Sequence, residues 1–411
     1  MADQGRDVWV TGIGLLSSIG EGPEPHWTFL SSKGASGRIE EQAFAPYPVH
    51  PLAAIDLGKQ IPKKSDQRQM EGWQRIGVYS AGLALDDGWV ARDPALLART
   101  NLVVAAGSGE RDTAVDAKVL QSISTSTDTA VLAKEILPTA LRPTLFLAQL
   151  SNLLAGNISI VHNVTGSSRT FMGEEMAGVS AVENAVRRIG ACQGDLFLVG
   201  GALNAEREDL LLNYELGRNL WAHPFAPVWQ RRAAGGGFVP GSVGAFLVLE
   251  ARSHAQGRGA KPYARIRTVV SDRSRRGAGE IRDTAAGLFD RMTARMAPGP
   301  LGVLSGASGV EPVTGEELEF LLGLEAEGFH PAIRAYGSRL GHSVEAHFPL
   351  GIALAALALS KGQFYPPFEA SSVERALDGP LDRVLVTGLG HWRGEGLALV
   401  ERVEGTGEVR S

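Results

Sequence analysis

The chain has 411 residues, of which 51 are glycine and one is cysteine, and its 40 basic and 45 acidic side chains give a net charge of −5. A single cysteine excludes an internal disulfide and any metal site built from several cysteines, and the mildly acidic balance argues against a nucleic-acid-binding protein. With 44% hydrophobic and 21% charged residues, the composition is that of a folded globular protein.

No targeting or membrane segment is recognisable in the sequence. Residues 1–7 are polar and lead directly into an apolar run, which is not the order of a signal peptide. The longest apolar stretch, residues 348–359, is shorter than the ~20 residues needed to span a bilayer. The spacing of His162, His330 and His347 matches no metal motif, so we interpret them as surface or packing residues. We expect a cytoplasmic protein without a metal, another cofactor, membrane insertion or nucleic acid.

Short apolar runs, mostly closed by glycine, alternate with segments of helical periodicity. Runs of this kind that are rich in Val and Leu are typical of buried strands. The predicted strands cover residues 8–14, 102–109, 196–201, 243–250, 301–309 and 384–390. The predicted helices cover residues 69–85, 114–137, 176–189, 280–296, 316–324 and 345–360. The alternation predicts an α/β fold.

Two pairs of segments repeat between the halves of the chain. LVVAAGSG at 102–109 resembles LGVLSGASG at 301–309, and VTGIG near the start resembles VTGLG near the end. The repeats favour an internal duplication, although two independent α/β domains also explain the alternation. A polar join at 256–261 places the predicted boundary between an N-terminal half, 1–255, and a C-terminal half, 256–411.

Two regions are predicted to be irregular. Residues 22–51 are rich in Gly, Pro and Ser, and residues 222–241 hold three prolines and a Gly-Gly-Gly run. Loops of this length in a compact protein are usually functional or cover a site.

Six segments together carry a resemblance to a known family, in the same order and at similar spacing. They are VWVTGIGLLSSIGEG at 8–22, DQRQM at 66–70, NLLAGNISI at 152–160, LVGGA at 198–202, GFVPGSVGAFLVLE at 237–250 and GRGAKPYA at 257–264. With them the chain resembles the elongating β-ketoacyl-acyl-carrier-protein synthases. The resemblance implies a thiolase-like fold of five layers, αβαβα, built from two duplicated halves, and a dimer in which the strand at 168–172 pairs with its equivalent in the other subunit.

The family's nucleophile is a cysteine thiolate at the N-terminus of a buried helix, where the helix dipole lowers its pKa. Counting back from the strand that ends at Gly200 and Gly201 places this position at Glu175, or at Glu174 if the alignment slips by one residue. The only cysteine, Cys192, follows the other end of the predicted helix, and we interpret it as a turn residue. Because a carboxylate cannot form the acyl thioester, the resemblance implies a chain that does not condense.

The other catalytic positions of the family are also altered. Its first histidine corresponds to Ala307 and its lysine to Gly337, whereas its second histidine is retained as His342. In the terminal turn, Leu389 occupies the position of the usual Phe gate, and His391 beside it is unusual for the family. We expect Glu174, Leu389 and His391 at the substrate pocket. We further hypothesise that Glu175 pairs with His342 or His391 and fills the former active site.

Segments 156–178 and 387–400 are more similar to the chain-length-factor subunits of type II polyketide synthases. Those subunits keep the fold, replace the cysteine, dimerise with a catalytic synthase and shape the cavity in which the chain grows. The resemblance implies a non-condensing subunit in fatty-acid or polyketide elongation, with a catalytic ketosynthase as heterodimer partner; a homodimer stays open. Further segments resemble synthase-like proteins of α-proteobacterial clusters that make very-long-chain fatty acids.

The alternative is an enzyme acting on acyl-carrier thioesters, as a 3-oxoacyl synthase or a malonyl decarboxylase that uses Glu175 and His342. Either function needs an acyl carrier protein. The family docks it through three basic residues, whose positions here are Ser65, Arg68 and Gln69. Of these three residues only Arg68 is basic, but Lys63 and Lys64 lie nearby in the sequence. We therefore expect weak docking of the carrier through Lys63, Lys64 and Arg68.

Overall fold

The computed structural model describes residues 6–34, 37–125, 129–141, 146–147, 149–294 and 296–403. Its strands form a mixed sheet in the order β4-β3-β5-β6-β1-β7-β11-β10-β8-β9, with the short β2 (Gly20–Glu21) paired to β1. The strands of the N-terminal half are β1 (Val8–Ser17), β3 (Asn101–Ala105), β4 (Ser168–Phe171), β5 (Leu196–Leu203) and β6 (Val243–Ala251). Those of the C-terminal half are β7 (Ala264–Asp272), β8 (Gly299–Ser305), β9 (Phe329–Ala335), β10 (Arg383–Leu389) and β11 (Glu395–Glu401).

The strand order shows the internal duplication directly. Read from one edge the first half runs β4-β3-β5-β6-β1, and read from the other edge the second half runs β9-β8-β10-β11-β7. In each half three parallel strands are followed by two antiparallel ones. The halves join where β1 pairs with β7, with Val8 opposite Ile266. Residues 102–109 and 301–309 therefore fall on equivalent strands, β3 and β8, as the duplication predicts. The pair VTGIG and VTGLG does not, because it falls on β1 and β10, whose equivalents are β7 and β5.

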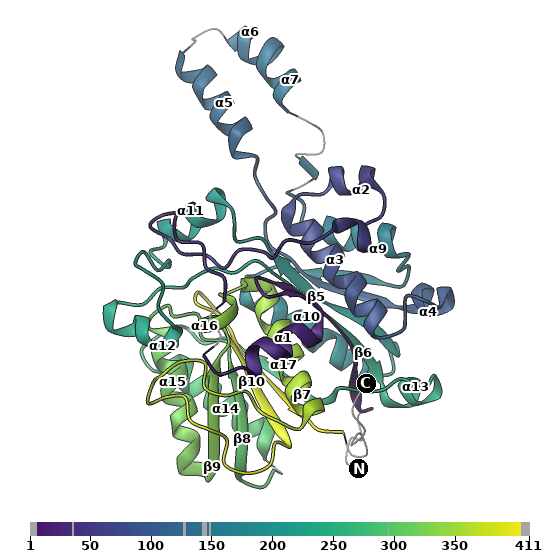
Figure 1. The fold of residues 1–411 in the computed structure, drawn as a ribbon, viewed down its shortest axis with the longest axis vertical. Coiled ribbons are helices and arrows are strands. Elements are labelled where there is room, and N and C mark those ends of the chain that lie inside the picture. Colours follow the sequence, from purple (N-terminus) through teal and green to yellow (C-terminus); the bar gives the residue numbers. More distant parts are fainter. Residues whose placement is uncertain are drawn as a thin grey trace.

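The helices cover this sheet in layers (Figure 1). α10 (Glu175–Gly190) and α17 (His347–Lys361) contact strands of both halves and form the central layer. α3 (Gly72–Asp87) and α9 (Leu153–His162) cover the outer face of the first half, and α14 (Glu280–Thr293) and α15 (Val313–Gly323) that of the second. The arrangement is the predicted αβαβα fold.

α17 shows why the centre of the protein is helical and apolar. Every residue from His347 to Leu359 is buried, and alanine and leucine, the strongest helix formers, make up most of the run. The helix ends at Gly362, whose left-handed backbone (φ 65°) suits glycine. The stretch Val344–Lys361 is long and apolar enough to cross a membrane, but 89% of it is buried inside the protein. Its hydrophobicity is explained by packing between the two halves.

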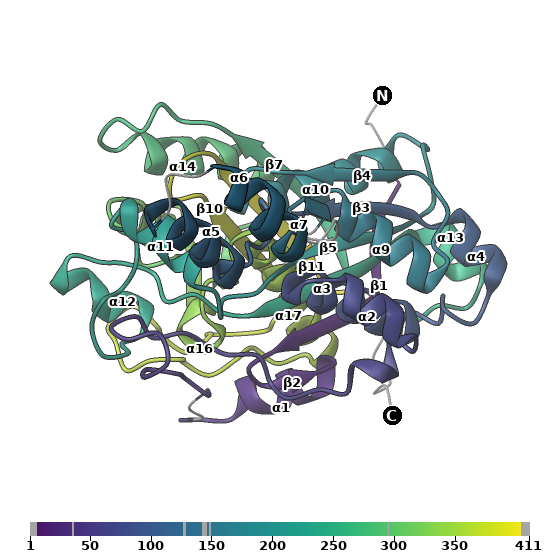
Figure 2. The same cartoon turned by 90° about the horizontal axis from the view of Figure 1, so that it is seen from above.

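An arm projects from this body along the long axis of the molecule (Figures 1 and 2). It consists of α5 (Thr113–Thr125), α6 (Thr129–Val131), a π-helical turn (Leu132–Ile136) and α7 (Leu137–Ala140), and no residue of these elements is buried. The single helix predicted for 114–137 is therefore divided among these elements, and residues 126–128 lie outside the described part of the chain.

The remaining elements are short. They are α1 (Pro23–Ser31), α2 (Lys64–Gln69), α4 (Pro94–Arg99), α11 (Glu208–Leu216), α12 (Val228–Arg231), α13 (Arg252–Gly257), α16 (Gly337–Leu340) and 3₁₀ turns at Leu57–Lys59, Arg232–Ala234, Leu324–Glu327 and Val344–Ala346. α1 contradicts the expectation that 22–51 is irregular throughout. A proline in its first turn suits a helix start, and His26 and Leu30 are buried.

Candidate functional site

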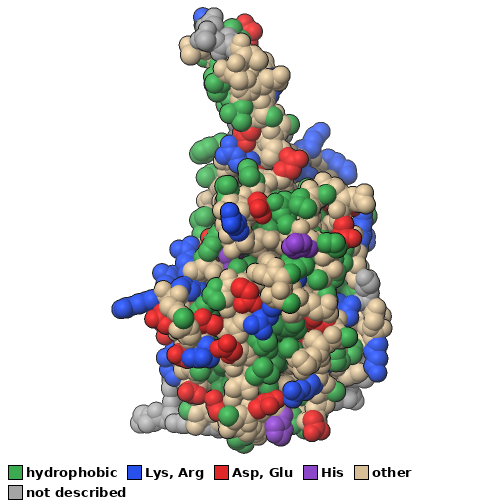
Figure 3. All heavy atoms as spheres, turned by 90° about the vertical axis from the view of Figure 1, so that its left-hand side faces the viewer, with side chains coloured by type: hydrophobic (Ala, Val, Ile, Leu, Met, Phe, Trp, Pro, Cys, Tyr) green, Lys and Arg blue, Asp and Glu red, His purple; other side chains and the backbone are tan. Residues whose placement is uncertain are grey.

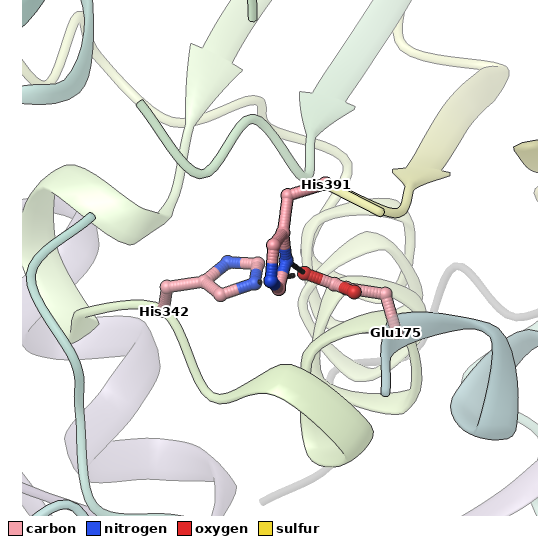
Figure 4. A group of neighbouring side chains, drawn as sticks. All are labelled: Glu175, His342 and His391. Carbon is pink, nitrogen blue, oxygen red and sulfur yellow. Dashed lines mark hydrogen bonds and ion pairs between the residues drawn. The ribbon is translucent and has the colours of Figure 1, made fainter. Parts of the chain in front are cut away.

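The site forms where three separate segments meet at the start of α10 (Figure 4). Glu175 is the first residue of this helix and is buried. The chain enters the helix through a tight turn, with positive φ at Gly173 (131°) and Glu174 (51°). His342 follows α16, and His391 lies in the turn between β10 and β11.

Both histidines converge on one carboxylate oxygen. His342 Nε2 lies 2.8 Å and His391 Nδ1 lies 2.5 Å from Glu175 Oε1. The sequence hypothesis expected Glu175 to pair with one of these histidines, and the structure brings both to it. The side chains of all three are at most 4% exposed, so these contacts lie in the interior.

The electrostatics of the three residues follow from this arrangement. Burial alone would raise the pKa of Glu175, but the charge of His391 and the hydrogen bonds from both rings hold that pKa well below its usual range. Burial lowers the pKa of His342, and Glu175 only partly offsets this. For His391 the charge and hydrogen bond of Glu175 outweigh burial, and its pKa is raised. These directions favour an ionised Glu175 and place more of the positive charge on His391 than on His342.

Aromatic rings enclose the two histidines. The ring of Phe238 lies 5.4 Å from that of His342 and 5.9 Å from that of His391. Tyr214 and Trp392 lie 5.5 Å and 4.4 Å from the His391 ring. The far nitrogens, His342 Nδ1 and His391 Nε2, are buried without a hydrogen-bond partner among the described residues.

Ala307 and Gly337, the residues predicted at the family's first histidine and lysine positions, carry no functional side-chain group. Ala307 is buried, and its N–H donates to Ser305 Oγ. A Cβ on Gly337 would lie 3.5 Å from the Ala307 carbonyl oxygen and 3.8 Å from the His347 ring. His347 is a packing residue, stacked on Tyr336 with its centroid 4.2 Å from that of His342.

The single cysteine is far from this chemistry. Cys192 is exposed in the turn that follows α10, with φ 57°, whereas Glu175 starts the same helix. A helix of 16 residues is about 24 Å long. No thiol can therefore replace Glu175 at the site.

A cavity of about 420 Å³ opens beside the cluster, and its wall includes Glu174 and Trp392, the chain neighbours of Glu175 and His391. Leu389, expected at the pocket, is instead buried in a core cluster with Ala307 and is not among the residues that line this cavity. Sequence reasoning missed most of the wall, notably Glu345, Tyr214, Arg207 and Trp73.

Charge inside the cavity is balanced locally. Arg207 pairs with Asp209 at 2.5 Å, and burial raises the pKa of Glu345 to about 7. Glu345 lies in the buried turn Val344–Ala346 that precedes α17, among His342, Ser343 and His347, so the sequence around it did not mark it as part of the wall.

The expected carrier-docking residues lie together on the surface. Lys63 precedes α2, and Lys64 and Arg68 lie on it, all three exposed. At another part of the surface, β4 ends the sheet and pairs only with β3 among the described strands, and Met172 beyond it is 60% exposed. An edge strand of this kind has free backbone groups for a further strand.

A comparison with known protein families identifies this architecture. The model of the β-ketoacyl synthase N-terminal domain matches residues 5–255, more than half of the chain. The chain belongs to the β-ketoacyl synthase family.

Individual β-ketoacyl synthases are distant from it. The 3-oxoacyl-[acyl-carrier-protein] synthase 2 of Vibrio cholerae is 27% identical over 270 residues, which cover 64% of this chain and 62% of that protein. The synthase of the same name from Rhizobium meliloti is 25% identical over 64% of this chain and 63% of its own length. The chain thus matches somewhat less than two thirds of the length of these curated relatives.

Solved structures match over nearly the whole chain. The ishigamide ketosynthase/chain length factor superposes with a TM-score of 0.76 at 20% identity, covering 97% of this chain and 99% of that one. A type II polyketide acyl-carrier protein in complex with its ketosynthase bound to the hexaketide gives 0.72 at 16% identity, with coverage of 97% and 99%. These similarities establish the ketosynthase fold, in agreement with the thiolase-like prediction.

Proposed function

We propose that this β-ketoacyl synthase homologue is a non-condensing subunit of the chain-length-factor type, which works with a separate, cysteine-containing ketosynthase. The observation that carries the proposal is the buried Glu175 carboxylate at the nucleophile position, engaged by His342 and His391. The chain keeps the helix that carries the family's nucleophile but has a glutamate in place of the cysteine.

The chemistry of condensation explains why this replacement matters. Transfer of an acyl chain to the synthase needs a thiolate that forms a thioester. An ionised carboxylate already bound by two imidazoles is a poor acceptor for that chain, and Cys192 is exposed at the other end of α10. Ala307 and Gly337 offer no side-chain donor to an enolate oxygen. Three parts of the condensing machinery are therefore missing together.

The surface supports a subunit that works with a partner. β4 presents a free sheet edge, and the arm, α5 to α7, has no buried residue of its own. Leu120 and Ile123 on the arm are 66% and 56% exposed, and Figure 3 shows hydrophobic side chains along this protrusion. Short helices without a core are unstable alone in water, so contact with another subunit would stabilise the arm.

The similarity to a solved ketosynthase/chain length factor over 97% of the chain supports the same role. The similarity to a ketosynthase in complex with its acyl-carrier protein supports a carrier as second partner. We propose a heterodimer with the catalytic ketosynthase, because a homodimer of this chain would contain no active-site thiol. The narrower assignment to very-long-chain fatty acids stays a prediction from sequence.

The alternative, an enzyme with Glu175 as general base, is less well supported. An effective base at neutral pH has a pKa near 7, whereas the pKa of Glu175 is held well below its usual range. Its Oε1 is also occupied by two donors.

Co-expression with a cysteine-containing ketosynthase from the same gene cluster tests the proposal. We expect a stable complex that condenses malonyl and acyl carriers, with a product length that changes when the cavity residue Leu203 is replaced by Trp. The matched control replaces the exposed Leu216 by Trp and should leave product length unchanged. A homodimer that does not bind the synthase would contradict the assignment. So would a complex whose product length is the same with the Leu203 variant as with the Leu216 variant.

A further inference from the structure

The three residues at the start of α10 also form a set of metal-type ligands. One ligand atom from each of Glu175, His342 and His391 lies within 4.8 Å of the other two, and all three residues are buried. They come from three different elements, and Figure 4 shows both rings pointing at the same carboxylate. No spacing in the sequence reveals such a set, because its members are 49 or more residues apart.

We propose that Glu175, His342 and His391 bind one divalent transition metal ion, for which Zn²⁺ is the best match. Two imidazole nitrogens and one carboxylate oxygen are a donor set that zinc takes in proteins, with a fourth position left for water. This proposal is separate from the chain-length role, since a metal could hold the subunit together whether or not it partners a synthase.

Both rings have few hydrogen-bond partners in this interior. His342 Nδ1 and His391 Nε2 are buried without partners in the described part of the chain, so Glu175 Oε1 is the only hydrogen-bond partner recorded for either ring. Buried polar groups normally have their hydrogen-bonding capacity filled. Both rings depend on one shared oxygen, and an ion bound by His342 Nε2 and His391 Nδ1 would replace these two shared hydrogen bonds with a separate bond to each ring.

The geometry needs only a small adjustment. Tetrahedral zinc with bonds of about 2.0–2.1 Å separates its ligand atoms by roughly 3.3 Å. The present separations of 2.8 and 2.5 Å are shorter, so each ring would withdraw from Glu175 by less than about 1 Å. His391 lies in the bend between β10 and β11, outside regular elements, whereas the backbone of His342 is held by a β-bridge to Pro240. Most of the adjustment would therefore fall to His391.

The surroundings provide an entry path and a suitable shell. Glu174 and Trp392, adjacent in the chain to two of the ligands, line the cavity through which an ion would arrive. The charge of Glu174 acts on His391, so this side chain adds negative charge beside the cluster and favours a cation. Phe238 and Trp392 supply the apolar shell that limits solvent access at metal sites. Once bound, the ion would join α10, the segment after α16 and the β10–β11 turn.

The test uses the full chain without a polyhistidine tag, stripped with EDTA and then titrated with ZnSO₄ or CoCl₂. We expect one zinc per chain after desalting, measured by elemental mass spectrometry, and visible d–d absorption from bound cobalt. His391→Ala and Glu175→Gln should each weaken zinc affinity by more than about 100-fold. His223→Ala, at an exposed histidine outside the cluster, is the control and should bind as the unaltered chain does.

Zinc-edge X-ray absorption tests the same site in the unaltered protein, so its result does not depend on whether the variants fold. A spectrum with two imidazoles and light oxygen ligands would support the site. Failure of the folded, unaltered chain to retain zinc, or equal retention by His391→Ala, would overturn the proposal. Neither result would affect the chain-length role, which is tested by product length.

Discussion

Two buried carboxyl groups in this protein behave in opposite ways. Glu175 starts α10 and accepts from two imidazoles, whereas Glu317 lies on α15 and accepts only from the hydroxyls of Ser305 and Thr387, both at 2.6 Å. Burial favours the neutral form of each. For Glu175 the imidazoles reverse that effect and lower the pKa, while burial raises the pKa of Glu317 to about 7. The partners, not the depth of burial, decide the direction of each pKa shift, so Glu175, at the predicted nucleophile position, favours its ionised form.

The largest effect should come from removing the cation beside Glu175. His391→Ala leaves a buried carboxylate with only the neutral His342, and loss of one partner of a buried ion pair costs about 3–5 kcal/mol. His342→Ala removes a neutral donor and should cost about 1–3 kcal/mol. Urea denaturation at pH 7 in EDTA measures both. Equal losses for the two variants would contradict the assignment of charge to His391.

Glu317 gives a pH dependence of defined sign. Its folded pKa of about 7 exceeds its reference value of 4.5, so the folded state binds the proton more tightly. The stabilisation is complete below pH 4.5 and is lost as the pH rises through 7. Glu317→Gln keeps an acceptor for both hydroxyls but does not titrate. At pH 8 its free energy of unfolding should exceed that of the unaltered chain by up to about 3 kcal/mol.

The measurement for Glu317 is the free energy of unfolding of both chains at pH 5 and pH 8. The two should differ little at pH 5 and diverge at pH 8. Parallel pH profiles would show that Glu317 does not keep its proton in the folded state.

A smaller effect is expected at the carrier-docking residues, which are exposed and screened, unlike either buried carboxyl group. Reversing the charge of Lys63, Lys64 and Arg68 together to Glu should weaken binding of an acyl carrier protein by about five-fold. The difference should shrink as salt is raised from about 0.05 to 0.5 M. Surface plasmon resonance at the two salt concentrations measures this, and a salt-independent loss would mean that the substitutions act by disturbing α2.

The smallest effect is predicted for the cysteine. Cys192→Ser changes an exposed turn residue far from Glu175 and should alter the free energy of unfolding by less than about 0.5 kcal/mol. Product length in complex with the ketosynthase should be the same. A changed product length would give the thiol a role that its position does not suggest.

Much of the fold could be predicted from local pattern. Short apolar runs, mostly closed by glycine, located β1, β3, β5, β6, β8 and β10, and the repeat between 102–109 and 301–309 reflected the equivalent strands β3 and β8. β7 and β9 were missed because charged residues, and in β9 a histidine and a proline, interrupt their apolar residues, as in ARIRTVVSD and FHPAIRA. α1 was missed because glycine and proline around it resemble a loop.

Only part of the candidate site could be predicted from the sequence. The contact between Glu175 and His342 could be predicted, because strand ends and small residues set their positions in the sequence. That Ala307 and Gly337 occupy the family's catalytic positions stays a prediction. That His391 reaches the same oxygen as His342 depends on how the β10–β11 turn packs against α10. The cavity wall joins segments such as 106–109, 207–214 and 345, which only the folded chain brings together.

The central claim is tested most directly by incubating the purified chain alone with malonyl- and acyl-carrier proteins and following product and intact protein mass. We predict no β-ketoacyl product and no covalent acyl adduct, with both appearing when the cysteine-containing ketosynthase is added and the adduct on that partner alone. An acyl adduct on this chain, or product formed in its sole presence, would contradict the account.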